Sequence, residues 1–207
     1  MELIGSLTAG SMIVEMALAL TGVPHTVTDV PYLKEGPERE RLLSLNPLGQ
    51  VPTLVLDDGT VMTESAAILL YLNDLVPGAG LLPPVGAADR AAVLNRLVWL
   101  VAAVYPTFTH GDDPSRWTLA GEAAKTLRDR TNVHREALFL GWDKVFGEGP
   151  FARGTEMCAL DIYLVAMTTW RPRRAWFDAH APRLAAAADA AAAHPLLAPV
   201  VARHRQG

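Results

Sequence analysis

Two kinds of hydrophobic pattern divide this 207-residue chain, and a segment rich in glycine and proline, Gly78–Gly86, separates them. Before the segment, short β-type runs alternate with helical patterns, whereas no β-type run follows it. The alternation predicts strands over residues 2–5, 25–30, 53–56 and 60–62, and helices over residues 11–21 and 36–44 and from residue 65. Strand–helix–strand units favour parallel pairing, and Asp57–Gly59 is typical of an antiparallel hairpin. We therefore expect a mixed four-stranded sheet with helices on its faces.

The rest of the chain is expected to be helical. Apolar residues at helical spacing predict a short helix near Trp176 and longer ones over residues 89–104, 118–140, 161–169, 182–193 and 195–204. We expect an α/β domain over residues 1–77, a linker over residues 78–86 and an all-helical domain over residues 87–207.

Composition and charge exclude several classes of protein. The net charge is −4 with acidic and basic residues intermixed, so no basic block indicates nucleic acid and no amphipathic anchor indicates a membrane. The single cysteine, Cys158, excludes an intramolecular disulfide, and the six histidines show no metal-ligand spacing. Since no basic leader precedes an apolar run near Met1, we expect a cytoplasmic protein. The spacing of the histidines leads us to expect no metal.

The most informative stretch is LNPLGQVPTLVLDDGTVMTESAAILLYL, residues 45–72. Three pieces follow one another in it: Asn46–Pro52 (NPLGQVP), the Asp57–Gly59 hairpin and Glu64–Ile68 (ESAAI). At this spacing they resemble the glutathione S-transferase family, and the resemblance extends over nearly the whole chain. It implies a thioredoxin-like domain followed by an all-helical bundle, glutathione as co-substrate, a small electrophile as second substrate, and a homodimer.

The resemblance assigns the cysteinyl and glycyl parts of glutathione to four residues. It implies that the Val51–Pro52 bond is cis and that the Val51 N–H and C=O bind the cysteinyl backbone by strand addition. Gln50 would reach the ligand backbone with its amide, and Lys34 would lie near the glycyl carboxylate. The residues alone leave plainer roles open, with Pro52 as an edge-strand proline and Lys34 as a surface lysine.

The γ-glutamyl part would bind at a helix start. The N–H and hydroxyl of Ser65 suit its α-carboxylate, because a helix N-terminus favours anions, and the Glu64 carboxylate suits its ammonium. An ordinary helix start capped by Thr63 is the plainer interpretation, and both roles can hold at once.

The group that activates the thiol is less clear from the sequence. A free thiol has a pKa of about 8.5, and the family lowers it with an early Tyr, Ser or Cys. Here the first strand has no tyrosine, and Gly10 stands at the position of the cysteine of the bacterial cysteine-type branch, so a mixed disulfide with the protein is not expected. We rank Ser11, at the helix start, before Thr8, in the turn, and Ser6 after both. Ser11 would otherwise serve only as a helix cap.

The electrophile site of the family lies between the domains, along the first long helix of the second. In this chain Tyr105, Phe108, His110 and Trp117 fall in the corresponding stretch, VYPTFTHGDDPSRW. They suit an apolar or aromatic electrophile, and they equally suit packing at a helix end.

One residue departs from the family pattern. The family has Ser or Thr three residues before a buried aspartate, as a helix cap, and Cys158 holds this position before Asp161. A thiol accepts hydrogen bonds more weakly than a hydroxyl, so the stability of this helix start is in question.

The expected activity is attack of the glutathione thiolate on a small apolar or aromatic electrophile. Two alternatives remain open. One is a glutathione-dependent disulfide reductase, peroxidase or isomerase on the same fold. The other is a non-catalytic protein that binds glutathione or apolar ligands.

Overall fold

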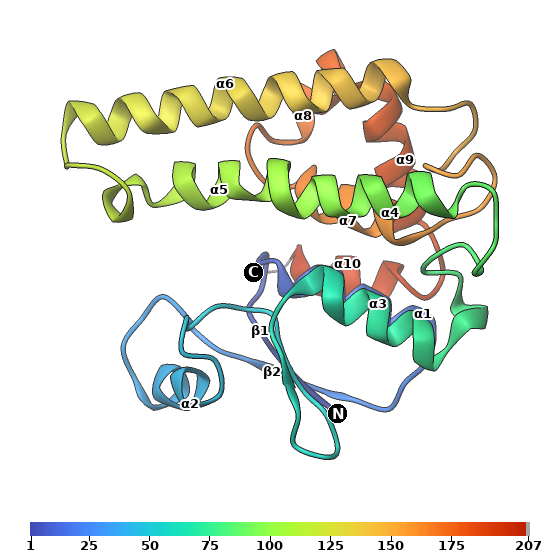
Figure 1. Cartoon of the computed structure of the whole chain (residues 1–207). Helices are drawn as coiled ribbons and strands as arrows, with labels where there is room; N and C mark the ends of the chain where they lie inside the picture. Colours follow the sequence, from blue (N-terminus) through green and yellow to red (C-terminus); the bar gives the residue numbers. More distant parts are fainter. Residues whose placement is uncertain (206–207) are drawn as a thin grey trace.

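The computed structural model describes residues 1–205, and the chain begins with an α/β domain built on a four-stranded sheet (Figure 1). The strand order is β2-β1-β3-β4, with β1 parallel to β2 and antiparallel to β3. The register pairs Leu3 with Val27 on one side and with Leu54 on the other. The predicted mixed sheet and its element order are confirmed. In chain order the elements are β1 (Glu2–Gly5), α1 (Ser11–Thr21), β2 (Thr26–Asp29), α2 (Pro37–Leu45), β3 (Thr53–Val55), β4 (Val61–Met62) and α3 (Ser65–Leu75).

Adjacent residues of β1 point to opposite sides of the sheet, and helices cover both of its faces. Leu3 and Ile4 are both fully buried, but they belong to different hydrophobic clusters. Leu3 shares its cluster with Met16 of α1 and Ile68 of α3. Ile4 packs instead with Leu42 of α2. The strand–helix alternation of the sequence thus becomes a three-layered domain.

The helical region follows a short 3₁₀ turn, η1 (Pro77–Ala79), and its α6 runs antiparallel to α4 and α5 (Figure 1). The domain boundaries predicted at residues 77 and 86 stay a prediction. The elements of this region are α4 (Arg90–Trp99), a π-helical segment η2 (Leu100–Val104), α5 (Tyr105–Asp112), a 3₁₀ turn η3 (Pro114–Arg116), α6 (Glu122–Val145), α7 (Ala159–Met167), α8 (Arg174–His180), α9 (Pro182–Ala192) and α10 (Ala198–His204).

The helix predicted to end at Val104 continues to Asp112. Pro106 has no N–H to donate and its ring crowds the preceding turn, so it disfavours an uninterrupted α-helix. The wider π-helical turn at Leu100–Val104 lies immediately before it, and the helical path passes the proline. The resulting Arg90–Asp112 segment has 23 residues and a hydropathy of 1.4, enough by length and composition to cross a membrane. In this fold α4 packs on α7 and α5 packs on α6.

Helix α7 is the centre of the helical region, and all its residues are buried. It begins at Ala159, earlier than the predicted residue 161, because Cys158 and Asp161 form a capping box. The Asp161 carboxylate accepts the N–H of Cys158 at 2.8 Å and the N–H of Ala152 at 2.8 Å. Burial raises the pKa of Asp161 to about 6, against the lowering effect of these two donors. The helix start is therefore fully capped although a thiol replaces the usual hydroxyl.

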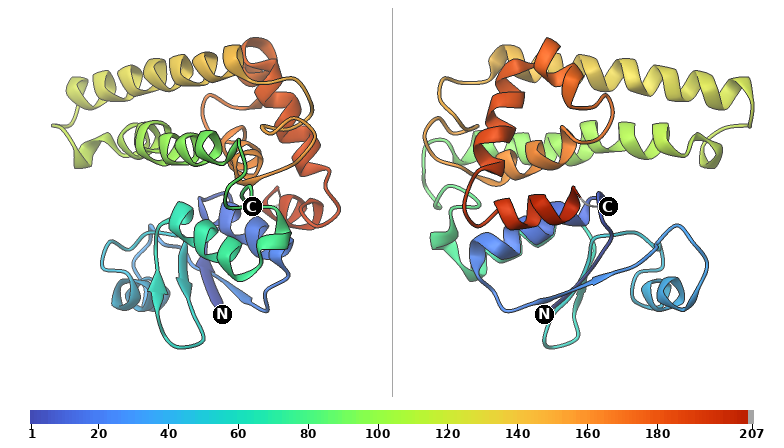
Figure 2. Two further views of the ribbon diagram at one scale, coloured as in Figure 1. Left: turned by 45° about the vertical axis from the view of Figure 1, so that its right-hand side comes forward. Right: turned by 180° about the vertical axis from the view of Figure 1, so that it is seen from behind.

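The end of the chain returns to the α/β domain. Helix α10 lies against α1, behind the sheet domain as Figure 2 shows from the far side. Arg203 of α10 forms an ion pair of 2.8 Å with Glu15 of α1 and a second ion pair with Asp29 at the end of β2. The last helix thus joins the two parts of the molecule.

We expect Asp161→Ala to lower the free energy of unfolding by about 2–5 kcal/mol, because the N–H groups of Cys158 and Ala152 lose their acceptor inside the protein. Urea denaturation followed by circular dichroism measures the change. Cys158→Ser is the matched control, and we expect it to change the same quantity by no more than about 1 kcal/mol, since serine is a good cap residue. A loss below about 1 kcal/mol for Asp161→Ala would show that other groups satisfy these donors.

Candidate active site

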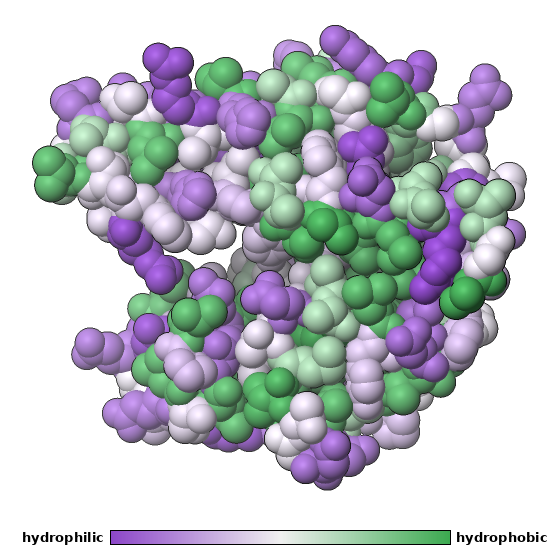
Figure 3. Space-filling view, in the orientation of Figure 1, coloured by the Kyte–Doolittle hydropathy of each residue, from purple (hydrophilic) through white to green (hydrophobic). Residues whose placement is uncertain are grey.

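The surface between the α/β domain and the helical region is hollowed into a groove, as Figure 3 shows. A cavity is lined by Thr8, by Trp170 and by residues of α8, α9 and α10, whereas Val51, Ser65 and Tyr105 are not among its lining residues. Its volume is about 940 Å³, within the range of small-molecule binding sites.

The turn before β3 presents the free backbone groups of Val51. The Val51–Pro52 bond is cis, as the resemblance implied. Within residues 1–205, neither the N–H nor the C=O of Val51 forms a hydrogen bond. The turn itself is held in place, because the Asn46 amide and the Thr53 hydroxyl both donate to the Gln50 carbonyl at 3.0 Å. An unpaired N–H and C=O on a fixed turn is what strand addition by an extended peptide requires.

The start of α3 leaves its first N–H groups without a side-chain cap. Its N-cap residue is Glu64, which makes no capping hydrogen bond, and Thr63 does not take this role. Ser65 is buried, and its hydroxyl shares a 2.6 Å hydrogen bond with the hydroxyl of Tyr163 from α7. Burial raises the pKa of Tyr163, so both groups are neutral hydroxyls. Since the pair uses one of its two protons internally, it can donate the other to an anion beside the helix start.

The Ser11 hydroxyl closes the loop between β1 and α1. It donates to the Ser6 carbonyl at 3.0 Å and accepts the Ser6 N–H at 3.0 Å. Gly5 makes room for it, because a Cβ at Gly5 would lie 2.8 Å from Ser11 Oγ. Ser11 is the first residue of α1, and the N-cap is Gly10. The one proton of this hydroxyl is used within the loop, which favours a structural role for Ser11 over the predicted activating role.

Thr8 has its backbone held by two side chains from the end of the chain. Its φ is +61°, a left-handed conformation that costs a non-glycine residue about 1–2 kcal/mol. Trp170 Nε1 donates to the Thr8 carbonyl at 2.8 Å, and the Thr8 N–H donates to His204 Nδ1 at 3.0 Å. Because Nδ1 accepts, we assign the ring proton of neutral His204 to Nε2, which lies 2.9 Å from Glu15 Oε2. Sequence reasoning missed His204 and Trp170, since nothing in the local pattern of either links it to residue 8.

Three aromatic side chains of the helical region stand together. Tyr105 and Phe108 of α5 have ring centroids 6.3 Å apart, and Trp170 lies edge-on to both, at 5.6 Å and 5.1 Å. The guanidinium of buried Arg135 lies 4.2 Å from the centroid of the Phe108 ring. The structure therefore brings two of the four predicted electrophile residues together and adds Trp170.

Other predicted residues are not brought to this cluster. The ring centroids of His110 and Trp117 lie 4.5 Å apart, and Trp117 is 54% exposed.

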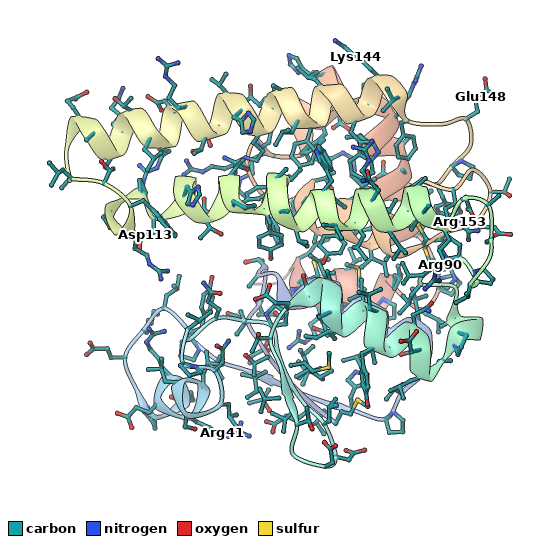
Figure 4. The ribbon with its side chains drawn as sticks, in the orientation of Figure 1. Arg41, Arg90, Asp113, Lys144, Glu148 and Arg153 are labelled. Carbon is teal, nitrogen blue, oxygen red and sulfur yellow. The ribbon has the colours of Figure 1, made fainter. Side chains whose placement is uncertain are left out.

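Lys34 is exposed in the loop after β2, and no ion pair to it is found in the described part of the chain. Figure 4 shows Asp113, just after α5, on the side that faces the α/β domain. No group of three His, Cys, Asp or Glu residues that could hold a metal ion occurs within residues 1–205.

The sheet order, the helical region and the free turn at Val51 define a thioredoxin-like domain joined to a helical bundle. Residues 11–75 match the family described as "Glutathione S-transferase, N-terminal domain". The chain is 42% identical over 196 residues to the "Uncharacterized GST-like protein YncG" of Escherichia coli (strain K12), which covers 94% of each chain. The chain therefore belongs to the glutathione S-transferase family, which confirms the family and fold class expected from the sequence.

Two further similarities bear on activity. The chain is 28% identical over 213 residues to "Maleylacetoacetate isomerase" of Pseudomonas aeruginosa, covering 88% of this chain and 86% of that one. A sphingomonad glutathione S-transferase, solved in complex with glutathione, superposes over 100% of both chains with a TM-score of 0.80 and 28% identity.

We expect His204→Ala to loosen the loop of residues 6–10, because the Thr8 N–H loses its acceptor while Thr8 stays in a costly conformation. The free energy of unfolding should fall by about 2–3 kcal/mol, and hydrogen exchange of the loop amides should accelerate. His134→Ala, at an exposed histidine of α6, is the control and should change stability by less than about 0.5 kcal/mol. Unchanged exchange in His204→Ala would mean that the loop keeps its shape without α10.

Proposed function

We propose that this protein is a glutathione transferase, which binds glutathione in the groove and presents its thiolate to a small apolar or aromatic electrophile. The observation that carries this proposal is the unpaired N–H and C=O of Val51 on a fixed turn. The sphingomonad relative with glutathione bound, which shares the whole fold, supports it.

The residues that would hold glutathione match its three parts. Val51 would pair with the cysteinyl backbone, and Gln50, exposed beside it, would reach the ligand with its side-chain amide. Ser65 and the first N–H groups of α3 would bind the γ-glutamyl carboxylate, while the exposed Glu64 carboxylate would bind the ammonium. Lys34 is free to approach the glycyl carboxylate from the loop after β2.

The reaction needs the glutathione thiolate and the electrophile, and no further reagent. The thiol of glutathione releases its proton to solvent, the sulfur electron pair forms a bond to the electrophilic carbon, and the leaving group departs with its bonding pair. The positive end of α1 favours the thiolate. The Ser11 N–H, which has no partner in the described part of the chain, and the exposed Thr8 hydroxyl can both donate toward it. We assign the Ser11 hydroxyl to bracing the loop.

The aromatic cluster of Tyr105, Phe108 and Trp170 would form the wall for the electrophile, because flat apolar faces suit aromatic carbon. His110 and Trp117 remain proposed lining residues farther along the chain. We also propose that the protein works as a homodimer in the cytoplasm.

A second function has a specific observation in its favour. The likeness to a maleylacetoacetate isomerase extends over most of both chains, which supports a glutathione-dependent isomerase. Reduction of disulfides or peroxides by glutathione needs the same bound thiolate. A protein that binds glutathione without turnover is the remaining alternative.

We expect calorimetry to detect glutathione binding to the wild-type protein, and Ser65→Ala to raise Kd by about tenfold or more, because a hydrogen bond to a charged group is worth about 1.5–3 kcal/mol. Ser44→Ala, at an exposed serine of α2, is the control and should leave Kd unchanged. Conjugation of a chromogenic aryl halide, a glutathione-dependent disulfide reductase assay and a cis–trans isomerase assay then separate the activities. Absence of binding would overturn the proposal, and binding without any turnover would favour the non-catalytic alternative.

We expect Ser11→Ala to affect stability more than chemistry, because its hydroxyl donates to the Ser6 carbonyl and not into the groove. The free energy of unfolding should fall by about 1–2 kcal/mol, while the pKa of the bound glutathione thiol should stay at its wild-type value. Urea denaturation and a pH titration of the thiolate absorbance measure the two quantities. A raised thiol pKa with unchanged stability would restore Ser11 as the activating hydroxyl.

A further inference from the structure

We propose that the hydroxyl of Tyr105, from the helical region, donates the hydrogen bond that holds the glutathione thiolate, in the place where residue 10 would otherwise carry its own side chain. The inference rests on the proposed function and names a catalytic residue for it. Sequence reasoning placed Tyr105 among the residues that face the electrophile, where it could donate a hydrogen bond to a developing negative charge, and not at the sulfur.

The position of the hydroxyl is defined by Gly10. A Cβ built on Gly10 would overlap Tyr105 Oη, and it would lie 3.3 Å from Tyr105 Cζ and 3.8 Å from Pro52 Cδ. Tyr105 Oη therefore occupies the space in which any side chain at residue 10 would begin. The hydroxyl and a side chain at residue 10 exclude each other, so Gly10 is the residue that admits Tyr105.

This space adjoins the position that a sulfur bound by the proposed contacts would take. It adjoins Pro52, and the preceding residue, Val51, carries the unpaired N–H and C=O that would dock a cysteinyl backbone. It also adjoins the start of α1, where the Ser11 N–H is free among the residues that the structure describes. A thiolate there would meet the positive end of a helix, one backbone donor and one hydroxyl.

The Tyr105 hydroxyl is available as a donor. Within residues 1–205 no hydrogen bond to it is found, and the hydroxyl is not fully enclosed, because Tyr105 is only partly buried. Burial raises the pKa of Tyr105, and the neighbouring Tyr163 of α7, Tyr32 after β2 and Glu64 before α3 act in the same direction. The group therefore keeps its proton at neutral pH and acts by donating a hydrogen bond, not as a base.

The ring of Tyr105 is held firmly enough to place its hydroxyl. Phe108 and Trp170 both meet it edge-on, with centroids at 6.3 Å and 5.6 Å. Trp170 is fixed in turn by its hydrogen bond to the Thr8 carbonyl. Tyr105 is also the first residue after the π-helical segment, and such segments are frequent at functional sites.

The other two hydroxyls are weaker candidates on the same criteria. The Ser11 proton is used by the Ser6 carbonyl, and Thr8 is exposed at the rim of the groove. Tyr105 combines a partly buried position, a free proton and direct approach to Gly10. In the reaction Tyr105 keeps its proton and stabilises the thiolate, while the thiol proton goes to solvent and the leaving group departs with its electron pair.

The test compares Tyr105→Phe with the wild-type protein. This substitution removes the hydroxyl and keeps the ring between Phe108 and Trp170. We expect Kd for glutathione, from calorimetry, to stay within about threefold, whereas the pKa of the bound thiol should rise by about 1–2 and kcat/KM for aryl halide conjugation at neutral pH should fall about 10- to 100-fold. Activity should recover as the pH is raised, since more thiolate then forms without the hydroxyl. Tyr71→Phe, which removes a tyrosine hydroxyl from α3, is the matched control and should change none of these quantities.

The substitution Gly10→Ala gives a second, independent test of the role of Tyr105. In the wild-type background the new Cβ displaces the Tyr105 hydroxyl, so we expect a loss of kcat/KM comparable to that of Tyr105→Phe. In the Tyr105→Phe background the overlapping oxygen is absent, so Gly10→Ala should cause a further loss of less than about threefold. Equal losses in both backgrounds would show that Gly10 does not act through Tyr105.

The outcomes separate this inference from the proposed function. Normal glutathione binding with an unchanged thiol pKa in Tyr105→Phe overturns the role of Tyr105 alone. A rise in thiol pKa caused by Thr8→Ala but not by Tyr105→Phe overturns it in favour of Thr8. Failure of the wild-type protein to bind glutathione overturns the proposed function and this role together.

Discussion

The backbone of Thr8 is held at both of its polar groups by side chains that come from the other end of the chain. Trp170 donates to its carbonyl and His204 accepts from its N–H, so a left-handed threonine is kept in place between β1 and α1. Two such bonds, each worth about 1 kcal/mol, are enough to offset the cost of that conformation. The loop that faces the groove thus takes its shape from the helical region.

Other residues of the α/β domain also depend on side chains of the helical region. Ser65, at the start of α3, shares its hydroxyl proton with Tyr163 of α7, and Gly10 leaves room for the hydroxyl of Tyr105. In both places a residue of the α/β domain meets a tyrosine of the helical region. The proposed site requires both parts of the chain, because the α/β domain alone has free backbone groups and a helix start but lacks these hydroxyls. This is the physical reason to treat the two parts as one functional unit.

Much of the fold and part of the site could be predicted from local sequence. The Val51–Pro52 turn and the Glu64–Ser65 helix start were identified because each depends on residues within a few positions of one another. Ser11 was ranked first for activation because it begins the helix, one position after the glycine that replaces the family's cysteine, whereas in the structure its proton is used by the Ser6 carbonyl. The continuation of the helix beyond Val104 was missed because the π-helical segment that accommodates Pro106 has no simple residue pattern. Trp170 and His204 were missed because their partner, Thr8, lies far away in the sequence.

The sequence by itself determined the family and the mixed sheet followed by helices. These follow from hydrophobic periodicity, turn residues and one continuous motif, all of which act over short distances along the chain. Only the tertiary structure decided which hydroxyls are free and which are used, because a hydrogen bond between Ser65 and Tyr163, or the approach of Tyr105 to Gly10, joins residues about a hundred positions apart. The availability of a proton depends on every neighbour of the group, and those neighbours are brought together only by folding.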